Sequence, residues 1–174
     1  MLTPVYSASA IKERVANIAE DLNKDFSVDE TVHVIVTLNG SFMFAADLLR
    51  LLKFPVVVHF AGASSYLGTE TQNLRIDPDS FPKSFGNKPV ILIEDVVDTG
   101  KTLGLLRQII ADRFAGSIKV ASLLKRQGGV GCDYHGFTIP KDMFVVGYGM
   151  DMDGRYRELP DLRAIGSATK EGLC

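Results

Sequence analysis

Three carboxylates and a glycine turn follow an apolar run in the middle of the sequence, and these residue types at this spacing are typical of a ligand site. After the apolar residues 90–93 come Glu94 and Asp95, two valines, Asp98 and the turn 99–102, which reads Thr-Gly-Lys-Thr. The turn opens an amphipathic segment, and the N-terminus of a helix presents unpaired N–H groups that bind anions. The pattern therefore predicts an anion site where a strand leads through acids into a helix.

The tripeptide at 100–102, Gly-Lys-Thr, is also found in the phosphate-binding loop of nucleoside triphosphatases. That loop requires an earlier glycine at a position where this chain has Asp95. A monophosphate bound by the N–H groups of the turn and by the hydroxyls of Thr99 and Thr102 fits better. A plain helix cap by Asp98 or Thr99 is the alternative, but a cap needs only one acceptor and the stretch offers three acids.

Glu94 and Asp95 are neighbours at the end of the predicted strand. Consecutive strand residues point to opposite sides of a sheet, so each carboxylate should meet a different part of a ligand. Two acids at this place could accept hydrogen bonds from a ribose diol or reach a diol bound to magnesium. A pair of solvated charges is the commoner case for such residues alone, and the following Asp98 and turn favour the ligand.

The elements that must position these residues alternate between strands and helices. Helical spacing of apolar residues predicts helices over 9–24, 42–53 and about 101–114, and apolar runs predict strands over 32–38, 56–61, 90–93, 118–124 and 143–148. This alternation predicts a doubly wound α/β fold with a parallel sheet, which binds ligands at the carboxyl ends of its strands. The segments expected to converge there are 38–41, 95–102, 125–126 and 148–151. A polar stretch over 62–88 is expected to form a long functional loop, within which Arg75 and Ile76 could be part of a short hairpin.

Composition limits the class of protein. The 174 residues fit one domain, and 46% hydrophobic with 23% charged residues indicates a folded globular chain. A net charge of −2 argues against broad nucleic-acid binding. The cysteines, Cys132 and Cys174, form no disulfide framework, and neither an apolar run of membrane-spanning length nor a signal peptide is recognisable. We therefore expect a cytoplasmic protein without a membrane partner.

The run from Glu94 to Thr102 resembles the phosphoribosyl pyrophosphate motif of the type I phosphoribosyltransferases. Further segments resemble other parts of the family. Residues 38–48 are similar to the first loop and its helix, and residues 64–66 to the start of the mobile catalytic loop. Residues 121–126 are similar to the segment with the purine-reading lysine, residues 144–151 to the base-binding strand, and residues 155–160 to the pyrophosphate-binding tail. This combination is most similar to the members that use 6-oxopurines. The resemblance implies one domain over 1–174, with a core at about 30–125, a small hood from the N-terminal and C-terminal segments, and a mobile lid at about 62–80.

The resemblance also implies a role for each matching residue. Glu94 and Asp95 would hold the ribose hydroxyls, and Asp98 would act as the general acid/base near purine N7. The set expected to bind the phosphoribosyl group is Glu94, Asp95, Asp98, Thr99, Gly100, Lys101 and Thr102. The set expected at the purine is Lys125 at O6, Phe144 stacked on the ring, Val145 through its backbone, and Asp151. Pyrophosphate would meet Asn39, Gly40 and Arg157, while Ser65 and Tyr66 would close over the site.

The implied reaction is purine salvage. A phosphoribosyl group passes from phosphoribosyl pyrophosphate to N9 of hypoxanthine or guanine, giving IMP or GMP and pyrophosphate. Mg²⁺ is the implied cofactor, held by Asp151 and reached indirectly by Glu94 and Asp95. The implied assembly is a homodimer or homotetramer. Two alternatives stay open: an enzyme that prefers xanthine, and a regulator of this fold that binds nucleotide and RNA.

One position departs from the family pattern. The first loop has Asn39 where a lysine is common, so a positive charge is missing beside the expected pyrophosphate site. We expect this loss to weaken pyrophosphate binding or to alter contacts between subunits.

Overall fold

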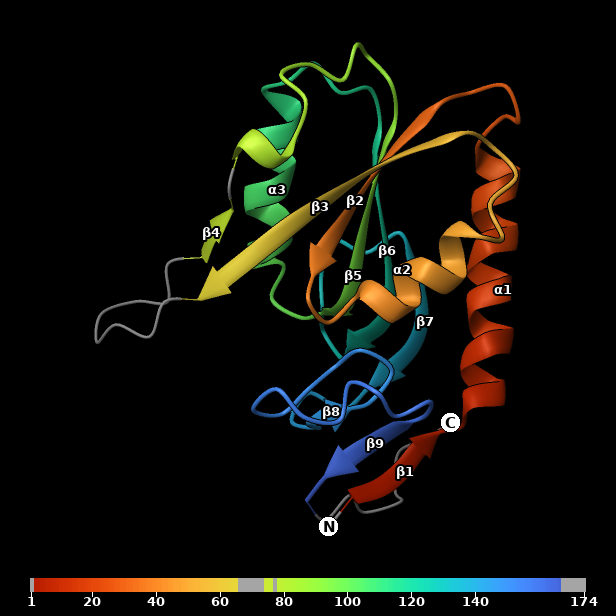
Figure 1. The fold of residues 1–174 in the computed structure, drawn as a ribbon, viewed down its shortest axis with the longest axis vertical. Coiled ribbons are helices and arrows are strands. Elements are labelled where there is room, and N and C mark those ends of the chain that lie inside the picture. Colours follow the sequence, from red (N-terminus) through yellow and green to blue (C-terminus); the bar gives the residue numbers. More distant parts are fainter. Residues whose placement is uncertain (1, 66–73, 77, 167–174) are drawn as a thin grey trace.

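A central six-stranded sheet organises the molecule (Figure 1). The computed structural model describes residues 2–65, 74–76 and 78–166. Across the sheet the strands run in the order β4 (Leu74–Ile76), β3 (Val56–Ser65), β2 (Val32–Leu38), β5 (Val90–Val97), β6 (Ile118–Arg126) and β7 (Tyr134–Ile139). All neighbouring pairs are parallel except β3 and β4, which are antiparallel. The expected parallel α/β sheet is therefore confirmed, with one antiparallel strand at its edge.

Helices cover both faces of this sheet. Helices α1 (Ala8–Asp25) and α2 (Phe42–Leu49) bury apolar stripes against one face, and α3 (Lys101–Ala111) buries its own stripe against the other (Figure 1). The central strands β2 and β5 are apolar on both sides, as expected for strands with helices above and below. This doubly covered sheet places the carboxyl ends of β2, β5 and β6 side by side.

A second, three-stranded sheet lies beyond the carboxyl ends of the central strands (Figure 1). It joins β1 (Leu2–Tyr6) to β9 (Leu162–Ile165) and β9 to β8 (Val145–Val146), and both pairs are antiparallel. Because β8 and β9 flank residues 147–161 in the chain, the small sheet holds this segment beyond the carboxyl ends of the central strands (Figure 1). A short 3₁₀ helix, η1 (Pro78–Ser80), precedes β5.

The predicted strand at 143–148 is wrong in extent and in place. Only Val145 and Val146 are in a strand, and they pair with β9 and not with the parallel sheet. Gly147, Tyr148 and Gly149 all have positive φ, which ends extended structure immediately after Val146. The 148–151 segment therefore reaches the site from the small sheet, and not from the end of a strand in the central parallel sheet as predicted.

Several boundaries also differ from the prediction. Helix α2 ends at Leu49 rather than at residue 53, and α3 ends at Ala111 rather than at 114, where Phe114 has positive φ. Strand β3 extends to Ser65, beyond its predicted end, and it pairs in antiparallel fashion with Arg75 and Ile76 of β4, where a short hairpin was considered within the expected loop. Strands β1, β7 and β9 were not predicted. None of the helices in the described part of the chain has the length and apolar character that a bilayer crossing requires.

Candidate active site at the carboxyl ends of the central strands

Glu94 lies in the middle of the sheet yet carries an ionisable side chain. It is 7% exposed, and one of its oxygens, Oε2, is 2.9 Å from the hydroxyl oxygen of Thr37 on β2. The other oxygen, Oε1, is buried without a hydrogen-bond partner. A buried acceptor left unpaired is costly, and such a group in a natural protein calls for a specific explanation. Glu94 thus has one carboxyl oxygen available to pair with a ligand.

Burial also changes the protonation of Glu94. Desolvation, followed by the neighbouring Asp95, raises the pKa of Glu94 to about 8, and the hydrogen bond with Thr37 opposes this rise. The Thr37 hydroxyl lies 3.0 Å from the carbonyl oxygen of Ile93 as well. With one proton it can donate to only one acceptor at a time, and a protonated Glu94 can donate to Thr37 in return. In the free protein Glu94 is therefore suited to hold a proton at neutral pH.

Asp95 faces the first loop. Its Oδ1 accepts a 2.8 Å hydrogen bond from the backbone N–H of Val96, and its Oδ2 lies where a Cβ on Gly40 would have to be. Burial raises the pKa of Asp95, while backbone hydrogen bonds and the charge of Arg157 oppose the rise. Only glycine at position 40 allows the loop after β2 to approach this carboxylate. The two acids therefore serve different surroundings, Glu94 toward Thr37 and Asp95 toward Gly40.

The turn after β5 forms a small cavity with Glu94. This cavity, of about 80 Å³, is lined by the Glu94 side chain and by residues 96–103. The N-cap of α3 is Gly100, in the left-handed conformation with φ of 74°, and no side chain caps the helix. The predicted alternative, a plain cap by Asp98 or Thr99, is thus wrong. The first N–H groups of a helix have no partner within it, so this uncapped end is free to bind an anion.

The 147–157 segment approaches the same place from the small sheet. A Cβ on Gly149 would overlap the carbonyl oxygen of Gly40, so the two loops are in contact through their backbones. Asp151 forms a 2.7 Å ion pair with Arg157, which also donates a 2.6 Å hydrogen bond to the carbonyl of Gly149. The charges of both side chains act on Asp95. Asp151, Arg157, Gly40 and Asp95 are therefore brought together, although they are more than 100 positions apart at the extremes.

Phe144 and Val145 flank the site differently. Phe144 is 50% exposed and precedes β8, whereas Val145 is buried in it and pairs with Ala164. A phenylalanine in an apolar run is usually a core residue, and the exposure of Phe144 shows that it is not one here. Its ring is available to a flat partner.

Lys125 and Asp98 lie at adjacent strand ends. Lys125 is half-buried near the end of β6, and its backbone pairs with Val97, the residue before Asp98. Burial raises the pKa of Cys132 and the charge of Lys125 opposes this rise, while burial and then Lys125 lower the pKa of His135. The ammonium group of Lys125 therefore lies within electrostatic range of the start of β7. Asp98 has a half-exposed side chain that forms a 3.4 Å ion pair with the Nε of Arg126.

Two residues at the site were missed or left unassigned by the sequence analysis. Thr37 was seen only as part of an apolar strand, and Arg126 had no assigned role. The contacts of both residues cross from one strand to another, from Thr37 to Glu94 and from Arg126 to Asp98. The available signal for each was a polar residue near the end of a predicted parallel strand.

Several of the expected site residues are exposed, and one lies outside the described residues. Asn39 is exposed, and Lys101 and Thr99 are exposed in the turn while Thr102 is half-buried. Tyr66 lies outside the described residues, and of Ser65 only its place at the end of β3 is described. Among the described residues no group of three or more His, Cys, Asp or Glu side chains is arranged to hold a metal ion by itself.

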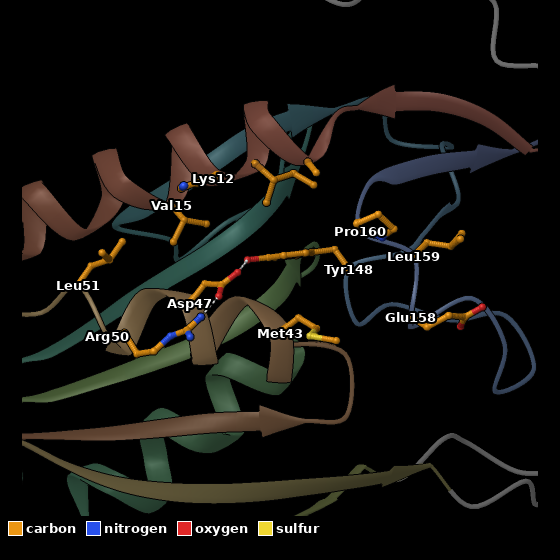
Figure 2. A pocket seen from close by; sticks show the side chains of 12 residues that line it. Lys12, Val15, Met43, Asp47, Arg50, Leu51, Tyr148, Glu158, Leu159 and Pro160 are labelled. Atoms are coloured by element: carbon orange, nitrogen blue, oxygen red, sulfur yellow. Dashed lines mark hydrogen bonds and ion pairs between the residues drawn. The ribbon is translucent and has the colours of Figure 1, made fainter.

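A larger cavity lies apart from these residues. It has a volume of about 500 Å³ between α1, α2 and the 148–160 segment, and none of the predicted site residues lines it (Figure 2). Within it the hydroxyl of Tyr148 donates a 2.5 Å hydrogen bond to Asp47 of α2. Burial and the Asp47 carboxylate raise the pKa of Tyr148, so the hydroxyl keeps its proton. This hydrogen bond links the segment that carries Asp151 and Arg157 to helix α2, which packs on the central sheet.

The contact at Gly40 gives a first prediction. Gly40→Ala should lower kcat/KM for the phosphate-bearing substrate about 10-fold or more, because the new methyl group would lie 1.7 Å from Oδ2 of Asp95 and displaces that carboxylate or the first loop by more than about an ångström. Gly104→Ala is the matched control, since a Cβ there meets nothing within 4 Å and the residue is in a helix. Steady-state kinetics on both variants decide the matter, and equal activity in the two would contradict the steric role of Gly40.

Comparison with known proteins gives one consistent family. Residues 2–153 match the phosphoribosyl transferase domain family. The chain is 36% identical over 168 residues to a hypoxanthine-guanine phosphoribosyltransferase of Dictyostelium discoideum, covering 91% of this chain and 92% of that protein. It is 38% identical over 157 residues to a hypoxanthine phosphoribosyltransferase of Salmonella typhimurium, covering 86% and 87%.

A solved structure agrees with these relatives. The fold is similar to that of a crystal structure of a hypoxanthine-guanine phosphoribosyltransferase from Bacillus anthracis, with a TM-score of 0.83 and 33% identity. That similarity covers 94% of this chain and 98% of the other. Sequence and structure therefore point to the same group of proteins over nearly the whole length.

Proposed function

Because the chain belongs to the phosphoribosyl transferase domain family, we propose that it is a purine-salvage transferase acting on hypoxanthine or guanine. It moves a 5-phosphoribosyl group from phosphoribosyl pyrophosphate to N9 of the base and releases pyrophosphate. The products are IMP and GMP. The proposal rests on relatives that share more than a third of their residues with this chain over most of its length.

One observation supports the sugar-phosphate half of the site above all. The unpaired, buried Oε1 of Glu94 belongs to the same residue that lines the cavity of the 98–102 turn. A ribose hydroxyl supplies the missing hydrogen bond to Glu94 while the 5′-phosphate binds the N–H groups of the turn. Asp95, on the other side of β5, accepts from the second hydroxyl or from water. Thr99 and Thr102 add hydroxyl donors to the phosphate, and Gly100 and Lys101 complete the turn.

The purine half of the site is formed by β6 and the 144–151 segment. The exposed ring of Phe144 stacks on the base, and the backbone of Val145 meets its edge. Lys125 donates to O6, which favours a 6-oxo base over a 6-amino base because two donors cannot pair. As N9 bonds to C1′ and the bond from C1′ to pyrophosphate breaks, Asp98 takes the proton from N7. Arg157 with Asn39 and Gly40 holds the pyrophosphate, and Ser65 and Tyr66 belong to the segment that excludes water.

Magnesium fits the donors of this chain. Mg²⁺ is commonly held by one or two carboxylates together with substrate phosphates and water, and not by a complete protein cage. Asp151 and Asp95 lie within electrostatic range of each other, and Glu94 has a free oxygen, so carboxylates are at hand without a closed cluster. When bound, the ion neutralises charge that develops on the leaving pyrophosphate. Asp151 is the ligand we assign, with Glu94 and Asp95 acting through the ribose hydroxyls.

The test is an assay of the purified protein with phosphoribosyl pyrophosphate and Mg²⁺ against hypoxanthine, guanine, xanthine and adenine in turn. We expect IMP and GMP, with xanthine and adenine poorer. A protein that makes nucleotide from xanthine fastest is the first alternative. No nucleotide from any 6-oxopurine, together with salt-dependent binding of RNA, would instead establish the regulator.

A second prediction concerns the base. Lys125→Gln should raise KM for hypoxanthine and guanine roughly 10-fold to 100-fold with little change in KM for phosphoribosyl pyrophosphate, because a charged donor to O6 is lost. Lys88→Gln is the control, because it also removes one positive charge but lies just before the start of β5, at the end of the sheet away from the site. The same change in both variants would speak against a contact with the base.

A homodimer or homotetramer is the assembly we expect. Sedimentation equilibrium on the wild-type chain measures it directly, and a monomer at all concentrations would overturn this part of the proposal.

A further inference from the structure

Arg126 makes more polar contacts near the site than any assigned role requires. Its Nε forms the 3.4 Å ion pair with Asp98. Its Nη1 donates hydrogen bonds to the carbonyl oxygens of Lys141 and Met143, both at 2.7 Å, and lies 3.5 Å from that of Pro140. The side chain is only 18% exposed. One guanidinium therefore bridges the end of β5 and the segment that leads into Phe144.

This geometry uses the particular shape of arginine. A guanidinium holds its donors in a rigid planar fork, so a carboxylate and a set of carbonyls bound to it are fixed relative to each other. The backbones of Asp98 and Phe144 are each held by a hydrogen bond to the carbonyl oxygen, from the N–H of Val130 at 3.2 Å and from the N–H of Ile165 at 3.0 Å. Their side chains are less constrained, since that of Asp98 is 52% exposed and Phe144 is 50% exposed. Arg126 contacts the Asp98 side chain and the backbone immediately before Phe144.

We infer that Arg126 is a positioning residue that fixes the Asp98 carboxylate against the plane on which the Phe144 ring receives the base. The inference rests on the proposed function, because it assigns Asp98 to the proton and Phe144 to the purine. Arg126 itself touches neither substrate nor reacting atom. It acts through two arms, one to the carboxylate of Asp98 and one to the 140–143 backbone. The first arm governs kcat, and the second governs affinity for the base.

The test is a double-mutant cycle between Arg126→Gln and Asp98→Asn, with kcat and the KM for hypoxanthine measured in each of the four proteins. In the wild-type background, Arg126→Gln should lower kcat about 10-fold or more, since misplacing a catalytic group by an ångström costs up to about 10²-fold. In the Asp98→Asn background it should lower kcat less than about 2-fold, because the carboxylate on which it acts is gone. The rise in KM for hypoxanthine should persist in both backgrounds.

Two further variants separate positioning from general stability. Arg126→Lys keeps a positive charge near Asp98 but loses the fork, so it should recover most of kcat and retain a raised KM for hypoxanthine. Arg113→Gln is the matched control: Arg113 also donates to two carbonyl oxygens, those of Phe81 and Pro82 at 2.9 Å, on the α3 side of the sheet. It should reduce the melting temperature and leave both kinetic constants unchanged.

The outcomes are distinct. A wild-type protein that makes no nucleotide overturns the proposed function. An active wild type in which Arg126→Gln lowers kcat by the same factor in both backgrounds overturns the positioning role of Arg126, as does an Arg113→Gln variant with the same kinetic losses. If Arg126→Gln does not fold, Arg126→Lys tests the fork through the KM for hypoxanthine, which should be raised in both the wild-type and the Asp98→Asn backgrounds, and a wild-type KM in that variant would overturn the role of the fork.

Discussion

Asp98→Asn is expected to lower kcat about 10²-fold to 10³-fold and to change the KM for phosphoribosyl pyrophosphate by less than about 3-fold, as general acid/base groups contribute on this scale. Asparagine keeps the shape of the side chain and an oxygen that can accept from Arg126, so the ion-pair partner is not left without an acceptor. What it cannot do is accept the proton that leaves the purine ring. The loss should therefore appear in the chemical step and not in substrate binding.

The measurement is steady-state kinetics with each substrate varied in turn, supported by a single-turnover experiment that separates chemistry from product release. Asp142→Asn is the matched control, because Asp142 is exposed and lies in the segment just before Phe144. A variant of Asp98 whose main defect is a raised KM for phosphoribosyl pyrophosphate would assign this carboxylate to substrate binding and not to proton transfer.

Glu94→Gln should stabilise the free protein at alkaline pH while it damages activity. The pKa of Glu94 is raised from 4.5 to about 8 in the folded protein, chiefly by burial. The folded state therefore binds a proton more tightly than the unfolded state, and the wild-type protein loses this contribution as pH rises from about 4.5 to 8. Glutamine is neutral at every pH and escapes the loss, which is worth roughly 4 to 5 kcal/mol at pH 8.5 at about 1.4 kcal/mol for each unit by which the pKa is raised.

Urea unfolding of both proteins at pH 4.5 and pH 8.5, without ligand, measures this effect. The free energies of unfolding should nearly coincide at the lower pH and separate at the higher one. Glu20→Gln on the exposed side of α1 is the control, and it should show no separation. The same Glu94→Gln variant should lose at least about 10-fold in kcat/KM for phosphoribosyl pyrophosphate, as an acceptor to the ribose is replaced in part by a donor. A variant less stable than wild type at pH 8.5 would contradict the unfavourable burial of the charge.

Asp98 and Glu94 show what local sequence can predict. The strand, the acids and the turn of the 90–102 stretch follow from neighbouring residues: branched apolar side chains favour a buried strand, and Gly100 alone permits the left-handed turn that opens α3. The opposite orientation of Glu94 and Asp95 follows from the two-residue repeat of a strand. The parallel sheet was likewise predictable, because its strands alternate with amphipathic helices along the chain.

The small sheet was not predictable in the same way. Strands β1 and β9 have only five and four residues, too few for a clear alternating pattern, and their hydrogen bonds join positions that lie almost the whole chain apart. The strand prediction for residues 143–148 was wrong for the opposite reason. The apolar pattern favours a strand, but the positive φ values from Gly147 to Gly149 end the strand after Val146.

The sequence by itself determined the order of strand, acids, turn and helix start at 90–102, because these features are encoded by adjacent positions. Only the tertiary structure decided how these acids are paired. Thr37 meets Glu94, Gly40 meets Asp95 and Arg126 meets Asp98 across strands that are neighbours in the sheet but distant in the chain. Such contacts depend on strand order and register, which arise when the whole sheet buries its two apolar faces.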